Sequence, residues 1–227
     1  MKRTFARLFD ADVSVAAADP RGEWARVLPG EESSLARATP SRRREFCAGR
    51  TLARQAMDGL GLPPQPIPSG PDRAPAWPDG VTGTISHCVD LCAAALARTD
   101  GGILSLGLDI EPAESLETDL FEEICTPREM AWLGIRADRA GLLARAIFSA
   151  KECAYKGQYP LSRTVLGFHA MSIELDLIAE RFRARFEEEV GPFDVGDEMN
   201  GRIIISSGHI VTALVLREDD LRARWNL

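Results

Sequence analysis

The chain has 227 residues, of which 34 are acidic and 27 are basic, so its formal net charge is −7. Apolar residues make up 45% and charged residues 27%, a mixture that is typical of a folded globular protein and excludes an intrinsically disordered one. The acidic balance argues against a nucleic-acid-binding protein, which needs clustered basic side chains to bind phosphates. The longest clean apolar run, residues 91–97, is far too short to cross a membrane, and charges interrupt the N-terminal segment. We therefore expect a cytoplasmic protein.

Helical and strand-like segments are mixed along the chain, without a strict β-α-β order. A helix is predicted over residues 40–61, because Thr39 can cap it and Pro40 suits its first turn. Seven prolines then predict an irregular loop at residues 62–80. The remaining patterns predict strands at 81–86, 92–98, 103–110, 170–177, 181–187 and 202–216, and helices at 116–125, 127–133 and 141–156. This mixture predicts an α/β protein of the α+β kind.

Two carboxylates stand at the end of a predicted strand, in the motif GLDIEP at residues 107–112. Because side chains alternate along a strand, Asp109 and Glu111 project from the same face, and Pro112 ends the strand. Like charges this close repel unless a cation lies between them, and Mg²⁺ is commonly bound by one or two carboxylates plus a phosphate. An exposed strand end followed by a turn is the alternative explanation.

A second cluster lies in FSAKECAYK, residues 148–156, within the predicted helix at 141–156. A helical projection places Arg145, Glu152 and Lys156 on the face opposite the apolar side chains. A weak surface ion pair would explain Glu152 and Lys156 alone. However, the chain has 24 arginines and only three lysines, and Lys151 and Lys156 are two of them. A compact ammonium that meets a phosphoryl oxygen is a reason to use lysine in such a chain.

The third cluster is basic and lies on the predicted helix at 40–61. Five arginines fall within thirteen residues of this helix: Arg42, Arg43, Arg44, Arg50 and Arg54. A solvated helix face would explain such a run, whereas arginine forks also match the geometry of a polyphosphorylated small molecule. Together the three clusters indicate Mg²⁺-assisted transfer of a phosphoryl-type group from a polyanionic donor.

Four motifs taken in chain order carry a resemblance to a known family. They are R-x7-R at Arg42 and Arg50, ISH at residues 85–87, GLDIEP at 107–112 and FSAKECAYK at 148–156. In this order and spacing they resemble the 4′-phosphopantetheinyl transferases of the Sfp/EntD type, in particular the bacterial EntD-like branch. The similarity extends from about residue 42 to residue 168.

The resemblance implies a fold and a reaction. The fold would be two pseudo-symmetric α/β halves, residues 1–111 and 112–227, with the active site and coenzyme A in the cleft between them. The reaction would move the 4′-phosphopantetheine arm of coenzyme A onto a serine of an apo acyl or peptidyl carrier protein and release adenosine 3′,5′-bisphosphate. A chain of this length would act as a monomer with Mg²⁺, in fatty acid, polyketide, nonribosomal peptide or siderophore synthesis.

The resemblance also assigns roles to residues. Asp109, Glu111 and Glu152 would hold Mg²⁺, and Glu152 would also take the proton of the carrier serine, directly or through water. Lys156 would steady the leaving phosphate, and Lys151 would lie beside the pyrophosphate. The other contacts with coenzyme A would come from the N-terminal half: Arg42, Arg50, Arg73, Ser86 and His87. Of these, Arg73 is the only basic residue in the loop ahead of the ISH strand.

The carrier protein is expected to dock on apolar side chains between the two motifs, namely Leu120, Phe121, Ile124, Met130 and Trp132. Packing of this stripe in the core is the alternative explanation. Two other functions share parts of the site: a catalytically silent module that binds coenzyme A or a carrier protein, and a Mg²⁺-dependent pyrophosphatase that cleaves coenzyme A with water. Product formation with and without an apo-carrier distinguishes the three functions.

Overall fold

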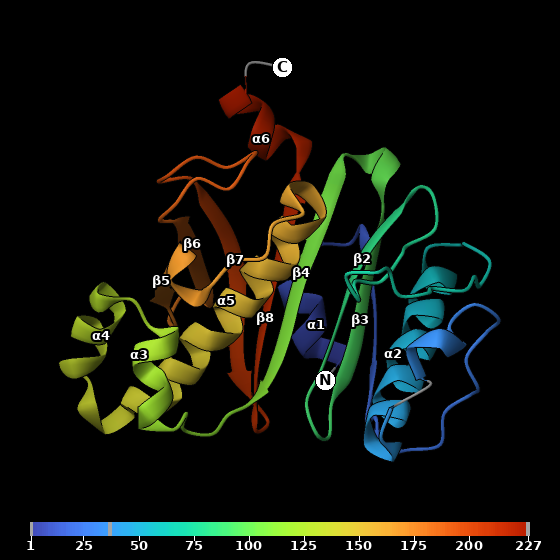
Figure 1. Cartoon of the computed structure of the whole chain (residues 1–227), viewed down its shortest axis with the longest axis horizontal. Helices are drawn as coiled ribbons and strands as arrows, with labels where there is room; N and C mark the ends of the chain where they lie inside the picture. The colour runs from blue at the N-terminus through green and yellow to red at the C-terminus, as the bar shows by residue number, and fades with distance from the viewer. Residues whose placement is uncertain (1, 36–37, 226–227) are drawn as a thin grey trace. The chain divides into compact units, whose positions relative to one another are not determined.

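The computed structural model describes residues 2–35 and 38–225 (Figure 1). Its contacts divide the chain into two compact units: unit 1 consists of Met1–Leu106 and Arg217–Leu227, and unit 2 of Gly107–Leu216. Each unit contains one long helix and an antiparallel sheet, so the predicted α+β class is confirmed. Among the described residues, no helix is long and apolar enough to span a bilayer.

Unit 1 is built on a three-stranded antiparallel sheet with the order β1-β3-β2. Its main elements are α1 (Lys2–Leu8), β1 (Val13–Ala18), α2 (Pro40–Gly59), β2 (Val81–His87), β3 (Cys92–Arg98) and α6 (Glu218–Trp225). Short 3₁₀ turns lie at Glu32–Leu35 and Thr99–Gly101. The helix α2 begins as predicted, because the Thr39 hydroxyl accepts a hydrogen bond from the backbone N–H of Arg42 and Pro40 occupies the first turn.

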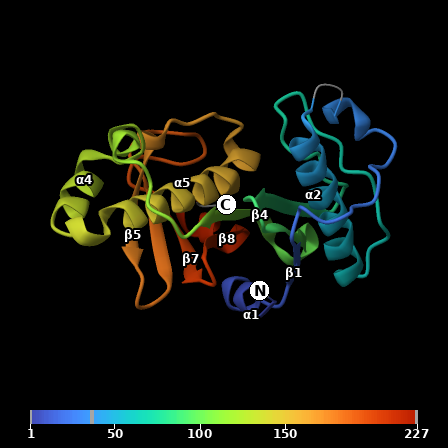
Figure 2. The same cartoon turned by 90° about the horizontal axis from the view of Figure 1, so that it is seen from below.

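The helix α2 packs against the sheet of unit 1 through small and aliphatic side chains (Figure 2). Leu52 and Met57 of α2 and Leu96 of β3 are fully buried in this core, and Ile67 joins them from the loop that precedes β2. That loop, residues 62–80, contains no helix or strand, as its prolines predict.

Unit 2 is built on a five-stranded antiparallel sheet with the order β4-β8-β7-β6-β5. The strand β4 (Ile103–Pro112) enters it from unit 1, and the others are β5 (Met171–Asp176), β6 (Arg181–Phe186), β7 (Glu198–Ser206) and β8 (His209–Arg217). The helices are α3 (Phe121–Ile124), α4 (Pro127–Gly134) and α5 (Ala140–Ser162), with 3₁₀ turns at Thr118–Leu120, Ala137–Arg139 and Phe168–Ala170. Figure 1 shows α5 running along the face of this sheet.

Three predicted elements differ from the structure. The run predicted as one strand, residues 202–216, belongs to a hairpin, because Ser207 and Gly208 adopt positive φ angles of 52° and 78° and turn the chain between β7 and β8. The helix predicted at 116–125 consists of a 3₁₀ turn and the short α3. The helix predicted to end at Lys156 continues through Pro160 to Ser162.

The strand β4 and the helix α5 approach each other closely at Gly107. A Cβ atom at this position would overlap the backbone carbonyl oxygen of Cys153 on α5 and would lie 2.9 Å from Cγ of Leu214 on β8. Glycine is therefore the residue that lets the α5 backbone lie against β4. This contact places β4 directly against α5 at Cys153.

We expect Gly107→Ala to destabilise the protein by about 1–3 kcal/mol, because the added methyl group would overlap the α5 backbone at Cys153, which cannot move aside as a flexible side chain can. Gly134→Ala is the matched control, since a Cβ at Gly134 would meet nothing within 4 Å. Urea unfolding measures both variants. Equal stability of the two variants would show that α5 does not depend on the space at residue 107.

Candidate active site

Two carboxylates project from the end of β4. The alternation predicted from the sequence is present: Leu108 and Ile110 are fully buried in the core, and Asp109 and Glu111 leave the strand on its other face. Asp109 is almost completely buried, whereas the Glu111 side chain is 19% exposed. The strand therefore delivers two acidic groups to a place that water reaches only in part.

The side of α5 that meets these carboxylates carries two cations. Arg145 and Lys156 lie eleven residues apart, about three helical turns, so they project from similar directions. Arg145 Nη1 donates a hydrogen bond to Glu111 Oε2 at 3.0 Å, and Lys156 Nζ donates to Asp109 Oδ1 at 2.7 Å. Glu152 lies between them along the helix and, among the described residues, makes no ion pair within 4.0 Å.

The crowding of negative charge changes how these groups hold protons. Burial, reinforced by the charge of Asp109, raises the pKa of Glu111 to about 7 despite the nearby Arg145. Burial also raises the pKa of Glu152; Lys156 opposes this effect and Asp109 adds to it. For Lys156 burial acts in the opposite sense, but Asp109 and Glu152 hold its pKa above the ordinary value. The site contains carboxylates that are ionised at a free-energy cost and an ammonium that stays charged.

The donor set suits a hard divalent cation. Carboxylate oxygens are the ligands that Mg²⁺ prefers. A divalent charge would stabilise the ionised forms of Glu111 and Glu152, whose pKa burial raises and the charge of Asp109 raises further. The three side chains do not form a complete set of metal ligands by themselves, because the oxygens of Asp109, Glu111 and Glu152 do not all lie within 4.8 Å of one another. The residues therefore fit Mg²⁺ in chemistry and leave room for ligands that the protein does not supply.

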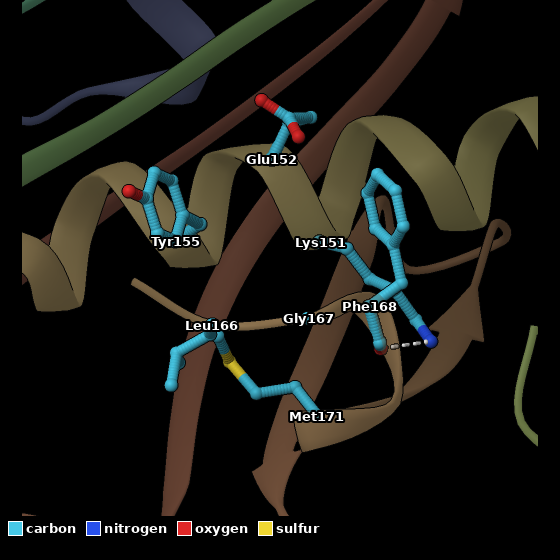
Figure 3. A pocket seen from close by; sticks show the side chains of 7 residues that line it. All are labelled: Lys151, Glu152, Tyr155, Leu166, Gly167, Phe168 and Met171. Carbon is cyan, nitrogen blue, oxygen red and sulfur yellow. Dashed lines mark hydrogen bonds between the residues drawn. The ribbon is translucent and has the colours of Figure 1, made fainter. Parts of the chain in front are cut away.

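A pocket of about 190 Å³ opens beside Glu152 (Figure 3). Its lining comes from α5 and from the segment that leads into β5, and it is mostly apolar, with Tyr155, Leu166, Phe168 and Met171 among the lining residues. Glu152 is the one carboxylate in this lining. A group that enters the pocket would therefore lie beside a carboxylate whose pKa is raised.

Lys151 does not share the orientation of Glu152. Figure 3 shows the two side chains leaving α5 on different sides, with Lys151 directed toward Phe168. The Lys151 ammonium is buried, lies 2.8 Å from Glu129 Oε2, and donates hydrogen bonds to the carbonyl oxygens of Ile124 and Phe168 at 2.7 and 2.8 Å. Because an ammonium has three donors, these contacts leave none for a pyrophosphate. The geometry thus argues against the predicted phosphate contact and gives Lys151 a structural place.

In unit 1, Arg42 and His87 are brought together from different elements. Arg42 Nη1 on α2 lies 2.9 Å from His87 Nε2 at the end of β2, and Glu45 Oε2 lies 3.7 Å from the same nitrogen. The Arg42 side chain is 57% exposed and the His87 side chain is 28% exposed. The structure therefore brings Arg42 of the R-x7-R motif and His87 of the ISH motif together in one partly exposed cluster.

The other residues predicted to contact coenzyme A differ in accessibility. Arg50 is buried and stacks on Phe46 with 4.3 Å from its guanidinium carbon to the ring centre, and burial lowers its pKa to about 10. Ser86 is buried in β2 opposite Ala93. Arg73 is exposed on a turn with a φ angle of 67°.

Comparison with known proteins identifies the family. Residues 30–97 match the model of the 4′-phosphopantetheinyl transferase N-terminal domain, and residues 105–199 match that of the 4′-phosphopantetheinyl transferase superfamily. The chain belongs to the 4′-phosphopantetheinyl transferases. The transferase activity predicted from the motifs that contain Asp109, Glu111, Glu152 and Lys156 is thereby confirmed at the level of the family.

Relatives with assigned names agree. The chain is 38% identical over 195 residues to the 4′-phosphopantetheinyl transferase Svp of Streptomyces mobaraensis, an alignment that covers 84% of this chain and 78% of Svp. It is 34% identical over 195 residues to PptT of Mycobacterium tuberculosis, covering 83% of this chain and 86% of PptT. The enterobactin synthase component D of Escherichia coli is 35% identical over 126 residues, covering 55% of this chain and 58% of that protein. Like other 4′-phosphopantetheinyl transferases, this one uses coenzyme A as substrate and acts on carrier proteins.

The stripe predicted to dock the carrier protein is only partly exposed in this transferase. Phe121 and Ile124 are 8% and 4% exposed and belong to the core of unit 2. Leu120 is exposed, and Met130 and Trp132 are partly so. The alternative explanation, packing in the core, therefore holds for Phe121 and Ile124.

Three charged residues of this 4′-phosphopantetheinyl transferase escaped the sequence analysis. Arg145 was placed on the correct helix face but given no role, and it binds Glu111. Glu129 is 2% exposed and pairs with Lys151; its capping box with Thr126 is a sequence signal that could have located it. Glu31 is completely buried beside Arg54, and no local pattern marks it.

A double replacement separates the structural role of Lys151 from a phosphate contact. Lys151→Met leaves Glu129 as an unpaired buried charge, so we expect a loss of about 3–5 kcal/mol in unfolding free energy. Adding Glu129→Gln removes that charge and keeps an acceptor for the backbone N–H of Ile173, so stability should recover in large part. Chemical unfolding and the KM for coenzyme A test both points. If the KM for coenzyme A stays above the wild-type value after stability has recovered, the result would instead support a contact between Lys151 and the pyrophosphate.

Proposed function

We propose that this 4′-phosphopantetheinyl transferase moves the phosphopantetheine arm of coenzyme A to a carrier-protein serine, with Mg²⁺ held by Asp109, Glu111 and Glu152. The observation that supports the proposal is the meeting of the two β4 carboxylates with Lys156 and Glu152 of α5. When bound there, Mg²⁺ would supply positive charge against the pyrophosphate oxygens. Adenosine 3′,5′-bisphosphate would leave as the second product.

Glu152 is the proposed general base. Glu152 has no ion pair among the described residues and is one of the residues that line the pocket beside α5, and burial raises its pKa. A base works best when its pKa lies near the working pH, and such help contributes roughly 10²–10⁴ in rate. Glu152 would accept the proton of the serine hydroxyl, directly or through one water, as the oxygen attacks phosphorus.

Lys156 is the proposed partner of the leaving phosphate. Its ammonium is held by Asp109 at 2.7 Å, and the surrounding carboxylates keep it charged. Negative charge grows on the bisphosphate as the P–O bond breaks, and a fixed cation stabilises that charge without reorganisation. Arg145 would keep Glu111 oriented, since its guanidinium already bonds that carboxylate.

Unit 1 supplies the proposed contacts with the phosphates of coenzyme A. Arg42 and His87 form a partly exposed pair, and Arg73 stands exposed on its turn. Arg50 and Ser86 are buried, so we propose that they support this surface and take a smaller share of the binding. Guanidinium groups suit phosphates because two parallel N–H bonds match two phosphate oxygens.

The choice of carrier pathway and the oligomeric state are also proposals. The similarity to an enterobactin synthase component favours a carrier protein of siderophore or related synthesis. We propose a monomer, since the chain supplies Asp109, Glu111, Glu152 and Lys156 from its own unit 2. Incubation with several apo-carriers and light scattering test these two points.

The transfer reaction is tested by weighing apo-carriers after incubation with coenzyme A, Mg²⁺ and the protein. The wild type should add one phosphopantetheine group, and Asp109→Asn and Glu152→Gln should lower the rate by about two orders of magnitude or more, because each removes a metal ligand and Glu152→Gln also removes the base. Glu188→Gln is the matched control in unit 2, because its carboxylate is exposed.

Near-normal turnover by either site variant would remove that residue from the mechanism. Release of adenosine 3′,5′-bisphosphate without an apo-carrier would indicate a pyrophosphatase instead. Binding of coenzyme A without product in either arm would indicate a silent binding module.

A further inference from the structure

In the loop that carries Arg73, Ile67 is held in unit 1 by both of its backbone groups and by its side chain. Ile67 stands between Pro66 and Pro68, so its N–H is the only backbone donor of these three residues. Glu31 Oε1 accepts a hydrogen bond from that N–H at 2.8 Å, and Arg50 Nε donates to the Ile67 carbonyl oxygen at 2.6 Å. The Ile67 side chain is completely buried. Both backbone groups and the side chain of one residue therefore anchor the loop.

Glu31 joins this anchor to two other segments. Its carboxylate is completely buried, which is unfavourable for a charge unless cations and hydrogen-bond donors surround it. Arg54 Nη1 on α2 provides the cation at 2.9 Å from Oε1, and the backbone N–H of Leu28 donates to Oε2 at 2.8 Å. Arg54 follows Arg50 by one helical turn, so both lie on one face of α2. From this face Arg50 binds the Ile67 carbonyl oxygen, and Arg54 binds Glu31, which accepts from the Ile67 N–H.

Hydrogen bonds continue from Ile67 to the turn at Arg73. Residues 69 and 75 form a β-bridge, and the backbone N–H of Ala76 donates to the Pro68 carbonyl oxygen at 2.8 Å. At the tip, the N–H of Gly70 donates to the Ala74 carbonyl oxygen at 2.8 Å, and the N–H of Arg73 donates to the Gly70 carbonyl oxygen at 3.0 Å. A shift of Ile67 would therefore move Arg73 with it.

We propose that Glu31 is a positioning residue for coenzyme A, which acts by holding Ile67 so that Arg73 presents its guanidinium to a phosphate of the nucleotide end. Glu31 does not contact the substrate in this proposal. The inference rests on the proposed function, in which Arg73 binds coenzyme A. Ser69 supports it from the other side of the anchor, since its hydroxyl accepts a hydrogen bond from Arg50 Nη2 at 3.2 Å.

A double-mutant cycle on the full-length protein tests the proposal. Glu31→Gln keeps the shape of the side chain, but a neutral amide cannot accept all three hydrogen bonds and no longer pairs with Arg54. We expect Arg73→Ala to raise the KM for coenzyme A about tenfold and Glu31→Gln to raise it about fivefold, with kcat at saturating coenzyme A nearly unchanged. Because both act through one contact, the double variant should stay near tenfold rather than reach the additive value of about fiftyfold.

Glu32→Gln is the matched control. It makes the same chemical change at the neighbouring residue, whose exposed carboxylate binds only the Gly30 N–H among the hydrogen bonds of this turn. The KM for coenzyme A should stay at the wild-type value in this variant. If Glu31→Gln does not fold, Glu31→Asp keeps the charge but shortens the reach by one methylene, and the same cycle with Arg73→Ala applies.

Several results would overturn the proposal. Additive effects of Glu31→Gln and Arg73→Ala would show that Glu31 does not act through Arg73. A fall in kcat with an unchanged KM for coenzyme A in Glu31→Gln would show that Glu31 contributes only to the general stability of the protein. An unchanged KM in Arg73→Ala would show that Arg73 does not bind coenzyme A, so that Glu31 would have no contact to position. Failure of the proposed function is a separate result, because the wild type would then produce no modified carrier at all.

Discussion

The contact between β4 and α5 brings together three acidic side chains that repel one another in a half-buried place. Asp109 and Glu111 come from the strand and Glu152 from the helix, and the absence of a side chain at Gly107 lets the two elements approach. Two cations of α5 limit the repulsion, Lys156 at Asp109 and Arg145 at Glu111. Burial, with the remaining repulsion from Asp109 adding to it, still raises the pKa of Glu111 to about 7. A cation bound beside these carboxylates, as we propose for Mg²⁺, would relieve this repulsion.

The two lysines of α5 differ in burial and in the partners of their ammonium groups. Lys151 meets Glu129 and two carbonyl oxygens, so all of its donors are used inside unit 2. Lys156 meets Asp109 and is 27% exposed, so it remains partly accessible from outside the protein, as its proposed role requires. Unit 1 contains a buried ion pair of the same kind as Lys151 and Glu129. The buried Glu31 pairs with Arg54 and anchors a loop that has few backbone donors of its own.

The parts of the site that follow from local periodicity could be predicted from the sequence. Strand alternation places Asp109 and Glu111 on one face, and helical projection places Arg145, Glu152 and Lys156 on one side of α5. The position of Lys151 could not be predicted in this way, because its partner Glu129 comes from another helix and only their packing brings them together. Glu31 escaped for the same reason, since Ile67 and Arg54 are distant in sequence.

Similar limits apply to the fold. The prolines of residues 62–80 were sufficient to predict the loop, and the cap at Thr39 was sufficient to predict where α2 begins. The strand β1 was not predicted, because its sequence VSVAAA lacks a strong alternation of apolar and polar side chains. The turn at Ser207 and Gly208 was not predicted either, because apolar residues on both sides read as one continuous strand.

Calorimetric titration of metal-free protein with Mg²⁺ tests the charge crowding at β4 and α5 most directly. Measured at about pH 6 in buffers of different ionisation enthalpy, it counts the protons released on binding. Because the pKa of Glu111 is about 7, this carboxyl group holds a proton at pH 6 and must lose it to bind the metal. The account predicts net proton release at pH 6 that decreases toward pH 8 and is reduced in Glu111→Gln. Binding of Mg²⁺ with no proton release at pH 6 would contradict it.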